Sequence, residues 1–200
     1  MTERRPTRLL LTDLRRIGHN PPRTLHEALR IAQRQAKNLL LLTGTYEPPV
    51  PTAILERDPK LELRWTNRLQ RVSGLCRWIG WRYVISVNRR EPMVRQRFTI
   101  FHELKHAIDG ASTTAAINRF TRPDRRSAAE AVADYFASCV LMPEPWVAAA
   151  VARGDDLDRL VRNFSVSKEA MRVRLAQLGV DPARSHAGRV PTGNTKGGRS

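Results

Sequence analysis

Two histidines and a glutamate stand within five residues of one another, in the pattern H-E-x-x-H at residues 102–106. An α-helix turns about 100° per residue, so His102, Glu103 and His106 would project from one side of a helix while apolar neighbours project from the other. Two imidazoles one turn apart can supply two nitrogen ligands to Zn²⁺ and leave room for a third protein ligand and a water. Glu103 would then lie beside the metal, placed to take a proton from that water. The five-residue pattern by itself is equally compatible with a solvated helix face that carries two histidines by chance.

Two carboxylates further along the chain can complete such a site. Glu130 and Asp134 lie one turn apart in a predicted helix, residues 128–141, which Ser127 would cap and which is otherwise almost wholly apolar. Carboxylates on a buried helix are costly unless a positive charge neutralises them, and a zinc ion would do so. We therefore expect Glu130 to be the third metal ligand and Asp134 to accept the outward N–H of a ligating histidine. The alternative is a pair of surface carboxylates on an exposed stripe.

Both stretches resemble the ImmA/IrrE family of metallopeptidases, which is of the glutamate-zincin type. Residues 97–106 are similar to that family's R-F-T-[LI]-x-H-E-[LI]-x-H motif, and residues 130–143 to its E-x-x-A-[ND]-x-F-A-x-x-L-[LM]-M-P helix. The resemblance covers roughly residues 48–180. It implies a small zinc endopeptidase, often encoded in bacteria, phages or mobile elements beside a helix-turn-helix repressor that it cleaves or inactivates to release transcription.

The resemblance also implies roles for individual residues. His102, His106 and Glu130 would hold one zinc ion per chain, and Glu103 would act as the catalytic acid and base. Lys105 stands where many members have glycine, a change that touches no ligand but could alter substrate preference. The group that stabilises the tetrahedral oxyanion is not identified, and by residue type alone three side chains qualify: Arg97, Tyr135 and His186.

The chain ahead of the motif predicts the elements that must position it. Thr24 can cap a helix that Gly44 ends, the proline-rich residues 46–51 form an extended linker, and a short helix follows at residues 52–56. Alternating apolar residues then predict three strands, at residues 61–65, 75–79 and 81–87, which form a small, largely antiparallel sheet. Its tryptophans, Trp65, Trp78 and Trp81, are expected to pack the sheet on the helices, with a role in the substrate groove as the alternative.

Two segments follow the motif helix and its partner. Residues 111–126 are polar and predict a surface loop, or alternatively a mobile flap near the site. Residues 157–179 predict two short helices joined by a turn, the outline of a helix-turn-helix, in which Ser167 caps the second helix and Gly179 ends it. The second helix would have a basic side made of Lys168, Arg172 and Arg174. The alternative is a helical hairpin packed against the peptidase, as the resemblance implies.

Composition limits the partners. The 200 residues include 35 basic and 19 acidic ones, a formal net charge of +16, which favours contact with nucleic acid or an acidic protein surface. DNA contact is expected, if anywhere, through residues 1–23, 157–179 or 181–200. Two cysteines, Cys76 and Cys139, are too few for a disulfide framework. Without a secretory segment or an unbroken apolar stretch, we expect a soluble cytoplasmic protein with no membrane contact.

The predicted fold is therefore α+β, with a small, largely antiparallel sheet packed on a zincin-like helical core and a C-terminal helix-turn-helix-like hairpin. A basic arm at residues 1–23 precedes a metallopeptidase domain at residues 24–180, and a disordered basic tail follows at residues 181–200. The predicted function is a zinc-dependent endopeptidase that hydrolyses a peptide bond in a regulatory protein, a helix-turn-helix repressor encoded nearby. The alternative is a DNA- or partner-binding regulator, or a toxin–antitoxin component, on a metallopeptidase scaffold.

Overall fold

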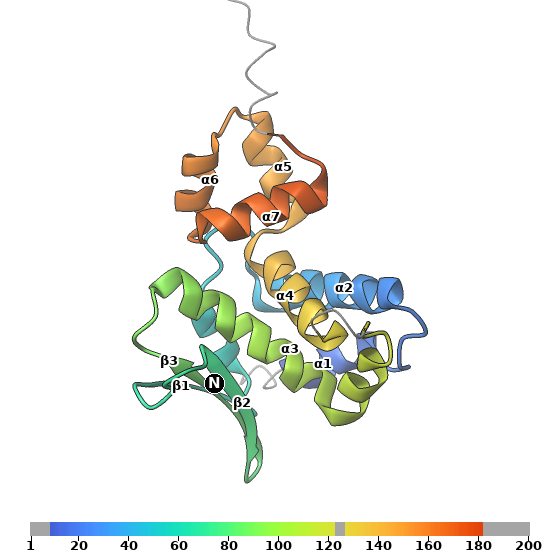
Figure 1. Cartoon of the computed structure of the whole chain (residues 1–200). Helices are drawn as coiled ribbons and strands as arrows, with labels where there is room; N and C mark the ends of the chain where they lie inside the picture. The colour runs from blue at the N-terminus through green and yellow to red at the C-terminus, as the bar shows by residue number, and fades with distance from the viewer. Residues whose placement is uncertain (1–8, 123–126, 182–200) are drawn as a thin grey trace, which may run out of the picture.

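The computed structural model describes residues 9–122 and 127–181, and these confirm the predicted α+β class (Figure 1). Eleven elements follow one another in these residues: α1 (Leu10–Ile17), α2 (Leu25–Thr43), the 3-10 helix η1 (Thr52–Arg57), β1 (Leu61–Thr66), β2 (Gly74–Ile79), β3 (Arg82–Asn88), α3 (Met93–Asn118), α4 (Ala128–Leu141), α5 (Glu144–Ala152), α6 (Leu157–Phe164) and α7 (Lys168–Leu178).

The sheet has the strand order β1-β3-β2, with β3 in the centre. Strand β2 pairs with β3 in antiparallel orientation across the tight turn at residues 80–81, as predicted, whereas β1 pairs with β3 in parallel. The prediction of a largely antiparallel sheet is therefore wrong for β1. Strand direction alternates along this part of the chain, so a strand that pairs with its second neighbour, and not with its first, must run parallel to it.

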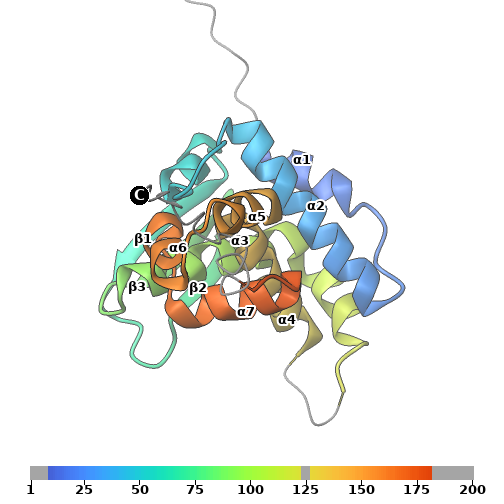
Figure 2. The same cartoon turned by 90° about the horizontal axis from the view of Figure 1, so that it is seen from above.

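Helix α3 packs on one face of the sheet, and α4 packs between α2 and α3 (Figures 1 and 2). The apolar side of α3 that the sequence predicted is buried, with Phe101 and Leu104 in one core together with Ile85 of β3 and Phe136 of α4. Only one face of the sheet contributes to that core. Of the three tryptophans expected in it, Trp65 packs against the core, but Trp78 and Trp81 lie at the end of the β2–β3 hairpin and are exposed.

The expected basic arm is partly folded. Residues 10–17 form α1, in which Leu10, Leu11 and Leu14 are buried in the main core. The backbone N–H of Leu11 donates to a carboxylate oxygen of Asp58 at 2.9 Å. A basic arm separate from the domain is therefore wrong for residues 10–17, because their leucines form an apolar stripe that packs on the domain. Residues 1–8 and the tail from residue 182 onward lie outside the described residues.

Helix α3 is longer than predicted. Its first part ends at Gly110, whose backbone φ of 62° breaks the helical geometry, and the helix then resumes as far as Asn118. A loop is therefore wrong for residues 111–118, where Ala116 and Ile117 are buried. The remainder of the predicted connector includes residues 123–126, which lie outside the described residues.

The C-terminal elements form a layer above α3 and α4 in Figure 1. Helices α6 and α7 match the predicted hairpin, with Ser167 as N-cap of α7 and Gly179 as its C-cap. Helix α5 was not predicted. No single helix of the described residues has the length and apolarity to cross a membrane; α4 and α5 reach them only jointly, across a bend of 51°.

Candidate metal centre

The structure brings His102 and His106 of α3 together with Glu130 of α4. The two Nε2 atoms lie 3.2 Å apart, and Glu130 Oε2 and Oε1 lie 3.4 Å from His102 Nε2 and 3.1 Å from His106 Nε2. In a tetrahedral zinc site with bonds of about 2.0–2.1 Å, neighbouring ligand atoms are roughly 3.3 Å apart. Two imidazole nitrogens and a carboxylate at this spacing therefore fit a zinc ion and leave a fourth position open.

The first turn of α4 places Glu130 next to the two histidines of α3. Glu130 lies in the first turn of α4, where the hydroxyl of Ser127 caps the helix by accepting from the Glu130 backbone N–H. Because α3 and α4 pack closely along their lengths, the start of α4 lies against the turn of α3 that carries both histidines. The carboxylate is half-buried and faces the two rings.

Asp134 lies one turn further along α4, with its Oδ1 2.8 Å from His102 Nδ1. An ionised carboxylate can only accept a hydrogen bond, so Nδ1 of His102 carries the proton. The lone pair of His102 Nε2 is then free to bind a metal ion together with His106 and Glu130. At the other imidazole, burial lowers the pKa of His106, and the neighbouring His102 lowers it further. Both effects favour the neutral ring, which is the form that binds a metal.

Glu103 lies beside this cluster and is half-buried. Burial raises the pKa of Glu103, the Glu130 carboxylate adds to that shift, and His102 and the backbone N–H of Cys76, which donates to Glu103, oppose it. The approach of β2 to α3 here requires a glycine, because a Cβ on Gly74 would lie 2.2 Å from Thr99 Cγ2. Such a carboxylate can exchange a proton nearer to neutral pH than an ordinary glutamate can.

The cluster opens into a cleft of about 770 Å³ between β2, α3, α4 and α7. Three residues of α7, Glu169, Val173 and Gln177, lie at intervals of four along the helix and line this cleft. These three residues were not predicted from the sequence as site residues. Their spacing puts them on the same side of α7, but nothing in the sequence indicates that this side faces the histidines.

The α6–α7 hairpin is packed on the helices of the metal cluster. Arg174, only 1% exposed, donates from Nε to the carbonyl oxygen of Met142 at 2.9 Å and lies over the ring of Tyr135. Arg97 of α3 donates from Nε to the carbonyl oxygen of Ser165 in the α6–α7 turn, at 3.2 Å. These contacts favour the packed hairpin over a free DNA-binding unit.

The expected basic side of α7 is not formed as predicted. Arg174 points into the protein, Lys168 pairs with Asp158 at 2.7 Å, and Arg172 lies 4.0 Å from Glu169. The remaining positive charge of this helix is therefore largely compensated by its own neighbours.

The three side chains considered for the oxyanion differ in position. Arg97 is engaged with the α6–α7 turn. Tyr135 lines the cleft, and burial raises the pKa of its hydroxyl, which interacts with Cys139 and Arg174. His186 lies outside the described residues. Tyr135 is thus the one of the three that the structure places at the cleft.

Comparison with known proteins gives two matches. The family model described as the IrrE N-terminal-like domain of peptidase M78 matches residues 63–176. A solved structure described as a Mycobacterium tuberculosis transcriptional regulator is similar with a TM-score of 0.56 and 21% identity, over 84% of this chain and 52% of that one. At that identity the likeness concerns the fold alone, and this chain spans about half the length of the regulator. None of the curated proteins matches the sequence.

Proposed function

The chain belongs to the peptidase M78 family of IrrE N-terminal-like domains, and on that basis we propose that it is a zinc-dependent endopeptidase. The observation that carries the proposal is the convergence of His102, His106 and Glu130 at ligand spacing, with the half-buried side chain of Glu103 beside them. In this proposal His102, His106 and Glu130 hold one zinc ion, Asp134 orients His102, and Glu103 is the catalytic acid and base.

Zinc, when bound, would supply Lewis acidity that polarises a peptide carbonyl and makes water acidic enough to attack near neutral pH. The protein's own residues handle the proton. Glu103 accepts it from the attacking water and passes it to the amine that leaves, two roles that suit a carboxylate whose pKa burial has raised. Asp134 keeps the proton of His102 on Nδ1, so that Nε2 remains a ligand throughout.

The proposed substrate is a regulatory protein, a helix-turn-helix repressor encoded near this gene, which would place the reaction in the cytoplasm. The cleft of about 770 Å³ supports a macromolecular substrate, because its lining extends from the start of β2 across α3 and α4 to α7. The similar solved structure is described as a transcriptional regulator, which supports a connection of this fold with transcription.

The test is to incubate the purified zinc-loaded chain with the neighbouring repressor and to identify the products by intact mass spectrometry. We expect one pair of fragments whose masses sum to the repressor plus one water. The matched control is Glu103→Gln, which preserves size and the metal ligands and should leave the repressor intact. Fragments produced equally by Glu103→Gln would mean that a contaminating protease made them.

A second function, a DNA- or partner-binding regulator on the same scaffold, is favoured by the net charge of +16. The packing of α7 against the cleft does not support DNA binding through residues 157–179 in the manner of a recognition helix. The two functions separate in one experiment. Repressor that is bound tightly by wild type and by Glu103→Gln, yet cut by neither, would favour the regulator.

A further inference from the structure

The face of the sheet that points away from α3 is not covered by a helix of the described residues (Figure 1). Alternation along the strands puts Arg64 of β1, Arg77 of β2 and Arg82 of β3 on this outer face, around Val84. Glu62 lies among them and pairs with Arg64 at 2.6 Å and Arg82 at 2.9 Å. Two of the three guanidiniums therefore share one carboxylate, and Arg77 has no ion-pair partner among the described residues.

The excess of positive charge extends along the whole sheet. Residues 60–90 contain eight basic residues and one acidic residue, Glu62; the basic ones are Lys60, Arg64, Arg68, Arg71, Arg77, Arg82, Arg89 and Arg90. Strand β3 spans roughly 20 Å, with Arg77 and Arg82 toward the hairpin tip and Arg89 and Arg90 just past the opposite end.

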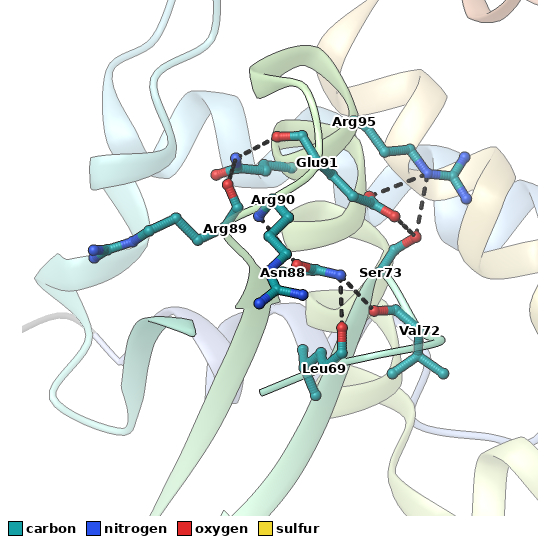
Figure 3. A network of polar contacts seen from close by, with 9 residues as sticks. Leu69, Val72, Ser73, Asn88, Arg89, Arg90, Glu91 and Arg95 are labelled. Carbon is teal, nitrogen blue, oxygen red and sulfur yellow. Dashed lines mark hydrogen bonds and ion pairs between the residues drawn. The ribbon is translucent and has the colours of Figure 1, made fainter. Parts of the chain in front are cut away.

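A polar network fixes the end of the sheet that carries Arg89 and Arg90 (Figure 3). The side-chain amide of Asn88 donates to the carbonyl oxygen of Leu69 at 2.7 Å, and the Ser73 hydroxyl donates to Glu91 at 2.7 Å. These bonds tie the β1–β2 loop to the turn after β3. The side chain of Arg89 points away from the network (Figure 3), and Arg89 and Arg90 are both exposed.

Large apolar side chains occupy the other end, at the tip of the β2–β3 hairpin. Trp78, Ile79 and Trp81 are 53%, 50% and 59% exposed. Arg82 lies over the ring of Trp81, 5.3 Å from its centre, and Trp78 meets Tyr83 edge to face. Trp81 lies in the hairpin turn beside Arg82 of the outer face, whereas Trp78 pairs with Tyr83 and projects from the other side of the same tip. Two exposed indoles at one hairpin tip are more than a monomeric protein needs for its own packing, and such a patch indicates a binding surface.

We propose that this basic–aromatic face, formed by the outer side of the sheet, the hairpin tip and the turn at residues 89–90, binds single-stranded nucleic acid. The arginines match the charge of a phosphate backbone, and exposed indoles offer stacking platforms to unpaired bases. An anionic membrane would also attract tryptophan and arginine, but it would contact the tip alone. The positive charge instead runs the length of the sheet, which fits a linear polyanion.

This binding goes beyond the proposed peptidase function and does not depend on it. Stacking and phosphate contacts do not use the ribose 2′-hydroxyl, so oligo(dT) and oligo(U) should bind with similar affinity. Both should bind more tightly than a DNA duplex of equal length, whose bases are already stacked. The salt dependence should be strong, because each phosphate contact releases counterions.

The test is fluorescence anisotropy of labelled 20-nucleotide oligo(dT), oligo(U) and duplex DNA with the full chain at several salt concentrations. We expect Trp78→Ala/Trp81→Ala to weaken single-strand binding by about five-fold or more, given the usual strength of base–aromatic stacking. Arg77→Ala should reduce the slope of log affinity against log salt by about 0.7. Matched controls are Tyr46→Ala, an exposed aromatic outside the face, and Arg30→Ala, an exposed arginine on α2; both should bind like wild type.

Circular dichroism melts would show that each variant is folded. The proposal is overturned if wild type does not bind oligo(dT) at about 50 mM salt, or if the double tryptophan variant and Tyr46→Ala bind equally well. It is also overturned if duplex and single strand bind alike, which would mean contact through phosphates alone. Sedimentation with phosphatidylserine vesicles that requires Trp78 and Trp81, without oligonucleotide binding, would assign the face to membranes instead.

Discussion

Helix α3 carries two groups of polar side chains, one on each side, and they are built differently. On the cleft side, His102 Nε2, His106 Nε2 and the Glu130 carboxylate point at one another, and the Asp134 carboxylate lies behind them against Nδ1 of His102. On the other side, Lys105 donates to Asp109 and, at 2.9 Å, to Gln35 Oε1, so a buried charge is neutralised within the protein.

The difference indicates which group is functional. Imidazole nitrogens and a carboxylate that converge on one point can bind a cation there, whereas Lys105 and Asp109 already neutralise each other. The side chains of Lys105 and Asp109 are 2% and 6% exposed, and neither lines the cleft. Changes on the cleft side should therefore alter chemistry and metal binding, and changes on the back of the helix should alter stability.

The largest effect is expected from Glu103→Gln. The amide cannot accept the proton of the attacking water, so kcat/KM on a peptide that spans the cleavage site should fall by about 10²–10⁴-fold. Bound zinc should remain, because Glu103 is not among the converging ligands. The measurement is initial rate by chromatography of the products, with zinc content determined on the same samples. A variant that loses its zinc together with its activity would assign Glu103 to the metal instead.

The next largest effect is on stability, from Asp109→Asn. Burial lowers the pKa of Lys105, and the Asp109 carboxylate opposes that shift, so removing the carboxylate leaves an uncompensated buried cation. We expect the free energy of unfolding to fall by about 3–5 kcal/mol in urea titrations. The matched change on the cleft side, Glu130→Gln, should lower it in the metal-free protein by about 1 kcal/mol or less. If both variants lost the same free energy of unfolding, the proposed distinction between the cleft side and the back of α3 would be wrong.

Asp134→Asn sharpens the comparison within the cleft side. The amide can still lie near His102 Nδ1 but no longer holds the proton there with a full negative charge, so zinc affinity should fall by about 10–100-fold. Competition with a fluorescent zinc chelator measures this directly. Asp156→Asn, a change at the N-cap of α6, is a control that should leave zinc affinity unaltered. An unchanged affinity in Asp134→Asn would exclude an orienting role for this carboxylate.

The smallest expected effect concerns the two cysteines. Burial, assisted by the charge on Glu103, raises the pKa of the Cys76 thiol to about 12, so little thiolate forms at pH 8 and iodoacetamide should react slowly. Glu103→Gln removes one cause of that shift, so alkylation of Cys76 should become a few-fold faster. Cys139, whose pKa is raised chiefly by burial and not by Glu103, is the internal control. Peptide mass spectrometry over time distinguishes the two sites; equal acceleration at both would indicate loosening of the fold.

The sequence predicted the elements that carry the metal cluster because their signals are local. Thr24, Ser127 and Ser167 cap helices that begin where predicted, and the apolar side of α3 is the buried one. The parts that were wrong depend on distant contacts. Nothing near Leu11 indicates that its N–H meets Asp58, and nothing near Trp81 indicates that the tip of the hairpin extends beyond α3.

Within the site, it was easier to predict which residues come together than to predict what surrounds them. The spacing of His102 and His106 on one helix and of Glu130 and Asp134 on another indicated which residues could meet, and the structure brings them together. Lys105 was considered for substrate preference, but it is buried on the far side of α3. The part of the cleft that α7 lines could not be predicted. Helical periodicity shows which residues lie on one side of a helix, but not which other element that side contacts.

The most direct test is the zinc content of three purified proteins, wild type, Glu103→Gln and Glu130→Ala, each supplied with zinc and desalted before mass spectrometry. We expect about one zinc per chain in wild type and in Glu103→Gln, and a loss of zinc in Glu130→Ala, because two imidazoles alone hold the ion weakly. Wild type that takes up no zinc, or Glu130→Ala that retains it fully, would contradict a metal centre made of His102, His106 and Glu130.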